Sequence, residues 1–299
     1  MGEIDLKNLR FIALVSILAC LLIVIPAGFA VDNETAIAIN GDNLTDGMND
    51  DILADDYYFD SANDNNGDGS QYDPYKSFNI NTIKDFSVNH VSSGEYDFNG
   101  AKTISDATIK GDMASNTIIN RASLTVDTQL TVYNVTFIDS SITNIGEQNL
   151  YNCIFRDSSS TMYGGAISST KDVTIDNCTF LNNNASCGGA VYVKGGSLNI
   201  INSYFKDNYA ELFGGAILAV STNTNISNTD FRNNKVDYNG GAVYSYYGDI
   251  IVTGSVFANN SADNGGALYI NNVDCILITD NNFTDNFAKT KANSIFSFN

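Results

Sequence analysis

The sequence predicts an all-β fold, a right-handed parallel β-helix of about ten coils that follows a signal peptide and an acidic linker. Two patterns predict the coils: a phenylalanine that recurs at nearly constant spacing, and a Gly-Gly-Ala triplet that begins eight or nine residues after it in five of the coils. The composition agrees, because 24 Gly, 41 Asn and only 2 Pro among 299 residues of low charge content favour strands and turns over helices.

The phenylalanine spacing gives the length of one coil. Successive spacings are 18, 25, 25, 26, 26 and 26 residues, with neither a helical period nor the leucine pattern of leucine-rich repeats. In a parallel β-helix, equivalent residues of successive coils stack roughly 4.8 Å apart. The sequence therefore predicts an inward column of stacked rings made of Phe137, Phe155, Phe180, Phe205, Phe231, Phe257 and Phe283.

Asparagine and glycine mark the bends between strands. Asn stands three residues before most of these Phe and three residues after the last five, where amides of adjacent coils are expected to hydrogen-bond as a ladder. The glycine pair allows a tight corner with positive φ. The Ala after the pair suits close backbone approach, and the aliphatic residue that follows is expected in the core: Ile167, Val191, Ile217, Val243 and Leu268.

The N-terminus has the features of an export signal. Lys7 and Arg10 precede the apolar run Phe11–Ile25, and cleavage is expected after Ala30. An uncleaved anchor stays open as the alternative, because Phe11–Ala30 is just long enough to span a bilayer. In either case the rest of the chain is expected outside the cytoplasm, extracellular or at the cell surface, with a membrane contacted only through this segment.

The chain divides into three parts by composition. Residues 1–30 are predicted to be the signal peptide, and 31–56 an acidic disordered linker. The stretch 31–75 holds twelve acidic residues and no basic ones. Residues 57–299 are predicted to form the β-helix, whose regular repeats cover 134–299.

The charge balance and the single histidine exclude several classes of function. The chain has 15 Lys and Arg against 34 Asp and Glu, whereas a nucleic-acid partner requires clustered basic residues. A catalytic triad or a His-rich zinc site would depend on His90 alone. No cofactor-binding fingerprint is present, so no cofactor is expected.

The two halves of the repeat resemble the polymorphic outer-membrane protein repeat, F-x-x-N followed by G-G-A-[ILV]. The first half stands at Phe180–Asn183, Phe205–Asn208, Phe231–Asn234 and Phe257–Asn260, and the second begins at Gly188, Gly214, Gly240 and Gly265. Such repeats occur in chlamydial surface proteins and in adhesin-like proteins of methanogenic archaea. The segment that begins at Tyr57 resembles the first strand of pectin-lyase-like right-handed β-helices. The resemblance implies a secreted, surface-exposed β-helix involved in attachment.

A stripe of tyrosines is the candidate binding site. The second residue after each Ala is Tyr192, Tyr244 or Tyr269 in three of the coils, and Tyr246 and Tyr247 lie close by. If the aliphatic residue before each of them faces the core, these tyrosines face outward. Exposed tyrosines suit a cell-surface glycan or protein partner. The alternative, in which this strand is turned over and the tyrosines are core, stays open.

The expected function is therefore that of a secreted or cell-surface adhesin-like protein, which binds without catalysis through the lateral face of the β-helix. One alternative is a β-helix carbohydrate-active enzyme, a lyase or hydrolase. Arg156, Asp157, Lys206 and Asp207 could share one face for that purpose, although a solvated outer row is the simpler interpretation. Another alternative is a purely structural envelope protein.

Two further patterns suggest weak sites. Asp64, Asn66 and Asp68 match the first half of a calcium loop, but position twelve is Tyr75, so a polar turn is favoured over calcium binding. Cys153 and Cys178 occupy the same column one coil apart, within reach of a disulfide. Two buried thiols are the alternative.

Overall fold

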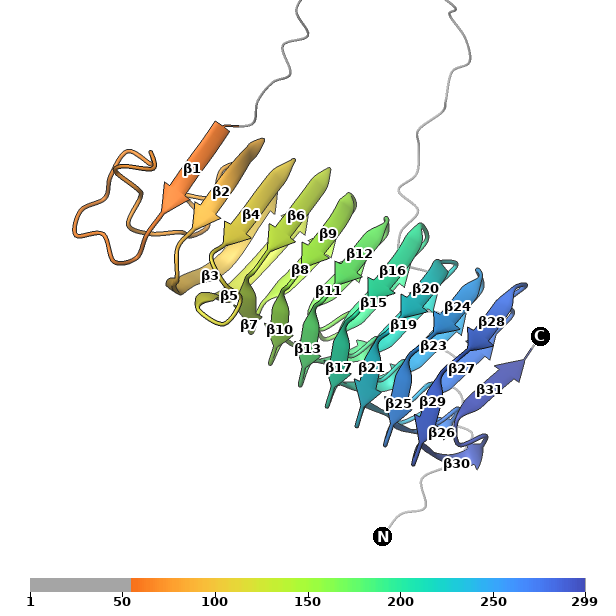
Figure 1. Ribbon diagram of the computed structural model, residues 1–299. Coiled ribbons are helices and arrows are strands. Elements are labelled where there is room, and N and C mark those ends of the chain that lie inside the picture. The colour runs from red at the N-terminus through yellow and green to blue at the C-terminus, as the bar shows by residue number, and fades with distance from the viewer. Residues whose placement is uncertain (1–54, 299) are drawn as a thin grey trace, which may run out of the picture. The chain divides into compact units, whose positions relative to one another are not determined.

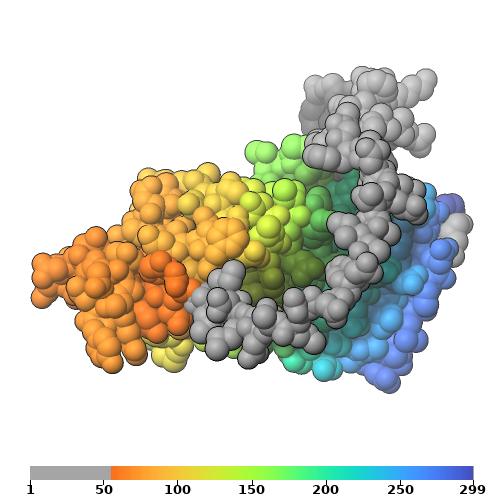
Figure 2. All heavy atoms as spheres, turned by 90° about the horizontal axis from the view of Figure 1, so that it is seen from above, coloured from red at the N-terminus to blue at the C-terminus, as the bar shows by residue number. Residues whose placement is uncertain are grey.

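The computed structural model describes residues 55–298. The predicted signal peptide (1–30) and nearly all of the predicted linker lie outside the described residues. Within residues 55–298 every element is a strand, and every strand pairing is parallel, as the sequence predicts. The strands follow one another as coils along one axis (Figure 1), and the colours run in order along this axis in the space-filling view (Figure 2).

The first sheet has one strand from each successive coil. Its ten strands are, in spatial order, β1 (Asp55–Phe59), β2 (Ser87–Val91), β4 (Ala107–Gly111), β6 (Gln129–Tyr133), β9 (Glu147–Tyr151), β12 (Val173–Asp176), β16 (Ser197–Ile201), β20 (Asn223–Ser227), β24 (Ile250–Thr253) and β28 (Ile276–Thr279). The first described strand, β1, includes Tyr57, where the β-helix is predicted to begin.

The second sheet consists of two stacks that share the long strand β5 (Thr117–Val126), which pairs with β3 (Gly94–Ile104). One stack holds the phenylalanine column: β7 (Thr136–Ile138), β10 (Ile154–Arg156), β13 (Thr179–Leu181), β17 (Tyr204–Lys206), β21 (Asp230–Arg232), β25 (Val256–Ala258) and β29 (Asn282–Thr284). The other holds the tyrosine stripe: β8 (Ser141–Asn144), β11 (Ile167–Ser169), β15 (Val191–Lys194), β19 (Ile217–Val220), β23 (Val243–Tyr246), β27 (Leu268–Asn271) and β31 (Ile295–Phe298).

The third sheet occupies only the C-terminal coils. Its strands are β14 (Asn184–Cys187), β18 (Tyr209–Phe213), β22 (Lys235–Val236), β26 (Ser261–Asn264) and β30 (Phe287–Lys291). A complete coil therefore visits four strand positions, for example β16, β17, β18 and β19, before β20 begins the next coil.

The solenoid has about eight turns, fewer than the ten predicted. The first sheet does contain ten strands, but the N-terminal coils are incomplete. Residues 60–86 lead from β1 to β2 as an irregular segment, and the long β3 and β5 stand where later coils have separate short strands. Counting apolar runs along the sequence therefore overestimates the number of full turns.

The phenylalanine column forms the predicted stack. Phe137 to Phe257 are fully buried, and adjacent rings lie 4.6–5.0 Å apart, within 11° of parallel. The last ring, Phe283, is partly buried against the same core. The strand register pairs Phe155 with Phe180 and Phe180 with Phe205, so the sequence period sets the stacking directly.

Two corners of each coil use residues in the left-handed conformation. The column three residues before each Phe has φ between 48° and 59°: Asn134, Asn152, Asn177, Asn202, Asn228, Gly254 and Asp280. The column two residues after each Phe has φ between 47° and 59°: Asp139, Asp157, Asn182, Asp207, Asn233, Asn259 and Asp285. Asn and Asp tolerate this conformation better than other non-glycine residues, which explains their presence in both columns.

A buried ladder of asparagines lies inside the second of these corners. Asn208 Nδ2 donates to Asn234 Oδ1 (2.9 Å) in the next coil and to the Phe180 carbonyl (3.0 Å) in the previous one. Asn208 Oδ1 in turn accepts from the backbone N–H and from Nδ2 of Asn183, both at 3.0 Å. The pattern continues along a column whose members are at most 7% exposed: Asn183, Asn208, Asn234, Asn260 and Asn286. The predicted ladder is confirmed.

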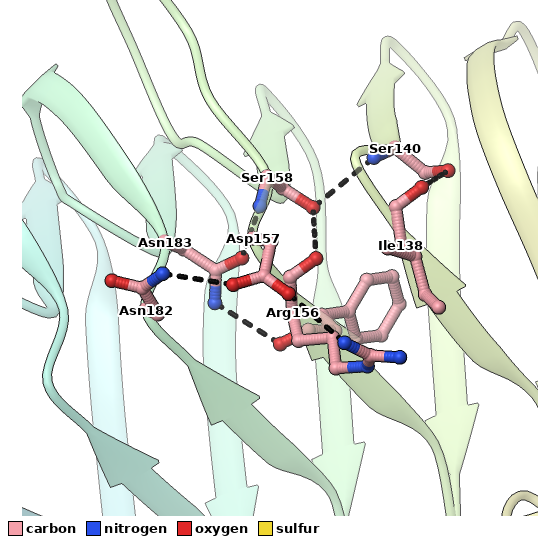
Figure 3. A network of polar contacts seen from close by, with 8 residues as sticks. Ile138, Ser140, Arg156, Asp157, Ser158, Asn182 and Asn183 are labelled. Atoms are coloured by element: carbon pink, nitrogen blue, oxygen red, sulfur yellow. Dashed lines mark hydrogen bonds and ion pairs between the residues drawn. The ribbon is translucent and has the colours of Figure 1, made fainter.

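Serine begins the ladder where the first coils lack asparagine. Asn183 Oδ1 accepts from the Ser158 N–H (3.1 Å), and Ser158 Oγ accepts from the Ser140 N–H (3.2 Å), as Figure 3 shows. On the outer side of the same corner, Asn182 Nδ2 donates to Asp157 Oδ1 (2.8 Å). The Ser158 hydroxyl thus makes one hydrogen bond to a neighbouring coil, whereas the Asn208 amide makes four.

The glycine pair forms a corner that a side chain would obstruct. Gly188 has φ of 63°, and a Cβ on Gly189 would collide with the backbone carbonyls of Gly215 and Tyr209 in the next coil. The Ala that follows each pair is fully buried, and the aliphatic column after it is in the core, as predicted.

Truncating one ring of the phenylalanine column should leave a cavity. We expect Phe205→Ala to lower the free energy of unfolding by about 3–5 kcal/mol, measured by urea denaturation. Phe287→Ala is the control, because Phe287 is 59% exposed and its loss should change stability little. A Phe205→Ala variant within about 0.5 kcal/mol of the parent would contradict an inward column.

Removing one amide from the buried ladder should cost more than its volume suggests. Asn208→Ala leaves the Asn183 N–H and the Phe180 carbonyl buried without their partners, so we expect a loss of about 3 kcal/mol or more in unfolding free energy. The control is Asn225→Ala, since Asn225 is exposed and donates to Asn199 Oδ1 on the surface. Equal losses for the two variants would mean that the ladder contributes nothing beyond side-chain packing.

Candidate binding surface

The tyrosine stripe lies on the outer side of the strands that follow the glycine pair. In β15 the alternating Val191 and Val193 belong to the main core, whereas Tyr192 between them does not. The register continues this outer position through Leu218, Tyr244, Tyr269 and Phe296 in β19, β23, β27 and β31. The predicted orientation of the strand is therefore confirmed.

The predicted exposure is wrong for two members of the stripe. Tyr192 is 5% exposed and Tyr244 is 8% exposed, although both point away from the main core. Aromatic residues just before the glycine pair cover them: Tyr163 stacks on Tyr192 at 4.4 Å, and Phe213 lies 5.1 Å from Tyr244. The tight corner folds this position back over the next strand and encloses the two rings.

The accessible tyrosines lie in the C-terminal coils. Tyr269 is half-buried between Tyr244 (4.9 Å) and Phe296 (5.1 Å). Tyr246 is also half-buried, and its ring centre lies 4.4 Å from that of Tyr247, which is 47% exposed. We call these rings together the outer aromatic layer: Tyr163, Tyr192, Phe213, Tyr244, Tyr246, Tyr247, Tyr269 and Phe296.

The covering residues have a signal in the sequence, an aromatic residue immediately before a glycine pair. Tyr163 and Phe213 immediately precede the glycine pairs that begin at Gly164 and Gly214. This position forms its own column, in which Cys187 pairs with both of them. Treating the position immediately before each glycine pair as a column of its own predicts that these rings lie beside the stripe.

Burial and hydrogen bonding change the acidity of the layer. Burial raises the pKa of Tyr244 to about 12, and it also raises the pKa of Tyr269. A hydrogen bond with Tyr247 is the main reason that the pKa of Tyr246 is raised. The hydroxyls are therefore neutral near pH 7, and the layer presents apolar ring faces with polar edges.

The charged row considered for catalysis does not gather into one site. Arg156 and Lys206 are two coils apart, since both pair in register with Leu181 between them. Arg156 binds the neighbouring Asp157 (3.1 Å), and Lys206 the neighbouring Asp207 (3.7 Å). Both carboxylates belong to the left-handed corner column, so the backbone conformation accounts for their presence.

In the segment that matches half of a calcium loop, two of the three candidate ligand side chains accept hydrogen bonds from nearby backbone N–H groups. Asn66 Oδ1 accepts from the Lys76 N–H (3.2 Å), and Asp68 Oδ1 accepts from the Ser70 N–H (2.9 Å), which lowers the pKa of Asp68. Asp64 lies in the same irregular segment and places only its backbone carbonyl near Lys76 Nζ (3.5 Å). Between residues 55 and 298, no three His, Cys, Asp or Glu side chains converge as a metal site would require.

Cys153 and Cys178 are free thiols in the structure, which corrects the possible disulfide. They occupy a column of capping side chains in which later coils have Ser203, Thr229 and Ser255. Cys178 Sγ accepts from the Cys153 N–H (3.4 Å), and each thiol donates to a nearby strand carbonyl. Burial raises the pKa of the Cys178 thiol well above its ordinary value, so the thiols act as buried hydrogen-bonding groups.

Comparison with known families gives one result. The Chlamydia polymorphic membrane protein (Chlamydia_PMP) repeat matches residues 177–194, 228–246 and 254–271. Each match begins at the first left-handed corner and ends in the strand that carries the tyrosine stripe, so the resemblance deduced from the sequence is confirmed. No curated protein and no solved structure matches the chain. The part of the chain that the structure describes contains no helix with the length and apolarity needed to cross a membrane.

The raised pKa of Tyr244 predicts a loss of stability in alkali. Its pKa is 10.0 in an unperturbed chain and about 12 when folded, so the folded protein holds a proton that the unfolded chain has released. This contribution is complete below pH about 10 and is lost as the pH rises toward about 12. We expect Tyr244→Phe to lose less unfolding free energy than the parent across that range.

The measurement is urea denaturation at several alkaline pH values, with the slopes against pH compared. The slope is the informative quantity, because Tyr244→Phe also removes a pH-independent contact with Asn271 Nδ2 (3.4 Å). Tyr72→Phe is the control, since Tyr72 is 96% exposed and should leave the slope unchanged. Identical slopes for Tyr244→Phe and the parent would contradict the assignment.

Proposed function

We propose that this protein is an exported, cell-surface adhesin-like protein that binds a glycan or protein surface through the outer aromatic layer, without catalysis. The observation that carries the proposal is the layer itself. Its rings lie outside the main core, yet they are packed against one another from one coil to the next. A stack of coils needs no second aromatic layer on its outer side to close its core.

The layer has the physical properties of a contact surface. The buried rings of Tyr192 and Tyr244 hold the layer rigid, while Tyr246, Tyr247 and Tyr269 present accessible faces and hydroxyls. Tyrosine supplies a large amphipathic contact area and loses little conformational entropy when it binds. A rigid, partly exposed tyrosine surface therefore favours stacking on sugar rings or packing against a protein.

The repeat supports a location at the cell surface. The matched repeat is described as that of a Chlamydia membrane protein, and the export signal predicted at residues 1–30 agrees with transport out of the cytoplasm. The N-terminal segment is the part of the chain that would contact the membrane if it stays uncleaved.

The ion pairs of Arg156 and Lys206 favour binding over catalysis. Each candidate base, Arg156 or Lys206, is paired with a carboxylate of its own coil on an exposed surface. A lyase or hydrolase needs its acid and base groups gathered around one sugar. A purely structural envelope protein would not need the accessible tyrosines.

The test is loss of attachment without loss of fold. The variant Tyr246→Ser, Tyr247→Ser, Tyr269→Ser removes the accessible rings and leaves Tyr192 and Tyr244 in place. We expect it to retain the β-type circular dichroism spectrum of the parent and to lose at least about tenfold in binding on a glycan array or to cells, since exposed aromatic anchors dominate such contacts.

The matched control is Arg156→Ala, Lys206→Ala, which changes two exposed side chains on another stack of the second sheet. This variant should attach like the parent, because exposed charges are screened by salt. Unchanged attachment of the tyrosine variant would contradict the proposal. Turnover of an acidic polysaccharide that disappears in the control variant would favour the enzyme instead.

A further inference from the structure

The N-terminal strands of the first sheet, β1, β2, β4, β6 and β9, lie side by side (Figure 1), and a second column of half-buried and exposed side chains runs across them. The register of β1, β2, β4, β6 and β9 aligns one outward position of each strand. We call this set the lysine column, because two aromatic pairs stand on either side of a lysine: Tyr58, His90, Lys110, Tyr133 and Tyr151.

The aromatic pairs are ordered and half-buried. The His90 ring stacks on Tyr58 at 4.5 Å and 6°, and its Nε2 lies 2.8 Å from Asp56 Oδ1. Tyr133 stacks on Tyr151 at 4.9 Å and 14°. Adjacent members of the column lie roughly one strand spacing apart, about 4.8 Å. His90 and Tyr133 are the members next to Lys110, so the ring face that each turns away from its stacked partner is directed toward the lysine position.

A pocket of about 560 Å³ opens between these pairs. Its lining includes Tyr58, His90, Lys110, Asp112, Tyr133 and Asn134. Gly111 lies at its base, where a Cβ would collide with the Asn134 carbonyl and with the Thr117 side chain. The volume falls within the range of ordinary small-molecule sites, about 300–1,000 Å³.

The pocket contains one lysine and one acidic side chain, and only the lysine lacks a hydrogen-bonded or ion-paired partner among the described residues. Lys110 is exposed and has no ion-pair partner between residues 55 and 298. The neighbouring acid, Asp112, is engaged elsewhere: its Oδ2 accepts from the Ser93 N–H (2.8 Å) and from Ser93 Oγ (3.4 Å). An ammonium group with no acidic partner thus stands between two aromatic platforms, on a protein whose formal net charge is −19.

We propose that this pocket binds an acidic saccharide, with the apolar face of a sugar ring on Tyr133 and the carboxylate of an adjoining group on Lys110. Aromatic faces suit the C–H face of a sugar, and a charge-assisted hydrogen bond from the ammonium selects an anionic unit. The second carboxylate oxygen of Asp112, Oδ1, accepts no hydrogen bond from Ser93 and can accept from a sugar hydroxyl group. A neutral sugar has no carboxylate to accept a charge-assisted hydrogen bond from the Lys110 ammonium group, so it should bind more weakly.

This site is separate from the outer aromatic layer. The lysine column belongs to β1–β9 of the first sheet, whereas the accessible tyrosines of the layer come from β23 and β27 and the corner after β23. The pocket can therefore bind its ligand whether or not the outer aromatic layer binds one.

The test uses the intact protein and isothermal titration calorimetry. The probes are oligosaccharides of galacturonate, glucuronate and N-acetylneuraminate, each with its carboxyl-reduced counterpart. We expect at least one acidic probe to bind, its reduced counterpart to bind at least tenfold more weakly, and the affinity to fall with added salt. Lys110→Gln and Tyr133→Ser should each weaken that binding at least tenfold.

Two control variants separate the sites. Lys235→Gln removes an exposed lysine from β22 of the third sheet and should bind the acidic probe like the parent. The variant Tyr246→Ser, Tyr247→Ser, Tyr269→Ser should also bind it normally, whatever its effect on attachment. Absence of binding by all three acidic probes, equal binding of the reduced probes, or undiminished binding by Lys110→Gln would each overturn the proposal.

Discussion

The buried asparagine ladder is the contact on which the rest of the structure depends. The inner amides, Asn208, Asn234 and Asn260, each donate twice and accept twice, so that the coils along the ladder are joined by side chain as well as by backbone. A shift of one residue between two coils would break these contacts and bury their polar groups unpaired, at a large free-energy cost. The ladder therefore fixes the register, and the register stacks the phenylalanines.

The corners constrain sequence more tightly than the strands do. Two columns require left-handed φ and contain Asn or Asp at every position except Gly254, and a third requires the glycine pair. Some of these corner residues are surface acids, such as Asp157 and Asp207. In the sequence they look like part of a catalytic site, because each follows a basic residue at the same position of its coil. In the structure they are set by backbone conformation and neutralised by the nearest basic side chain, which is why their chemistry is structural.

Outward strand positions are free of these constraints, and the two candidate sites lie there. On the second sheet the tight glycine corner encloses the outer rings in a layer of their own. On the first sheet the same outward freedom places Lys110 between two aromatic pairs. The same solenoid thus offers one largely apolar surface and, on the first sheet, one pocket that contains the Lys110 ammonium group.

The sequence by itself determined the all-β parallel fold, the inward phenylalanines, the amide ladder and the aliphatic column. Successive coils have nearly the same length, so a residue that recurs once per coil stacks on the equivalent residue of the next coil. The sequence favoured an outward tyrosine column but left the turned-over strand open, and the structure decided between them by placing Val191 and Val193 in the core. Only the tertiary structure decided that Tyr192 and Tyr244 are covered, since the rings that cover them come from the neighbouring corner rather than from the same column. It also decided that His90, Lys110 and Tyr133 share one pocket, because the N-terminal coils are irregular and no fixed period aligns these residues in the sequence.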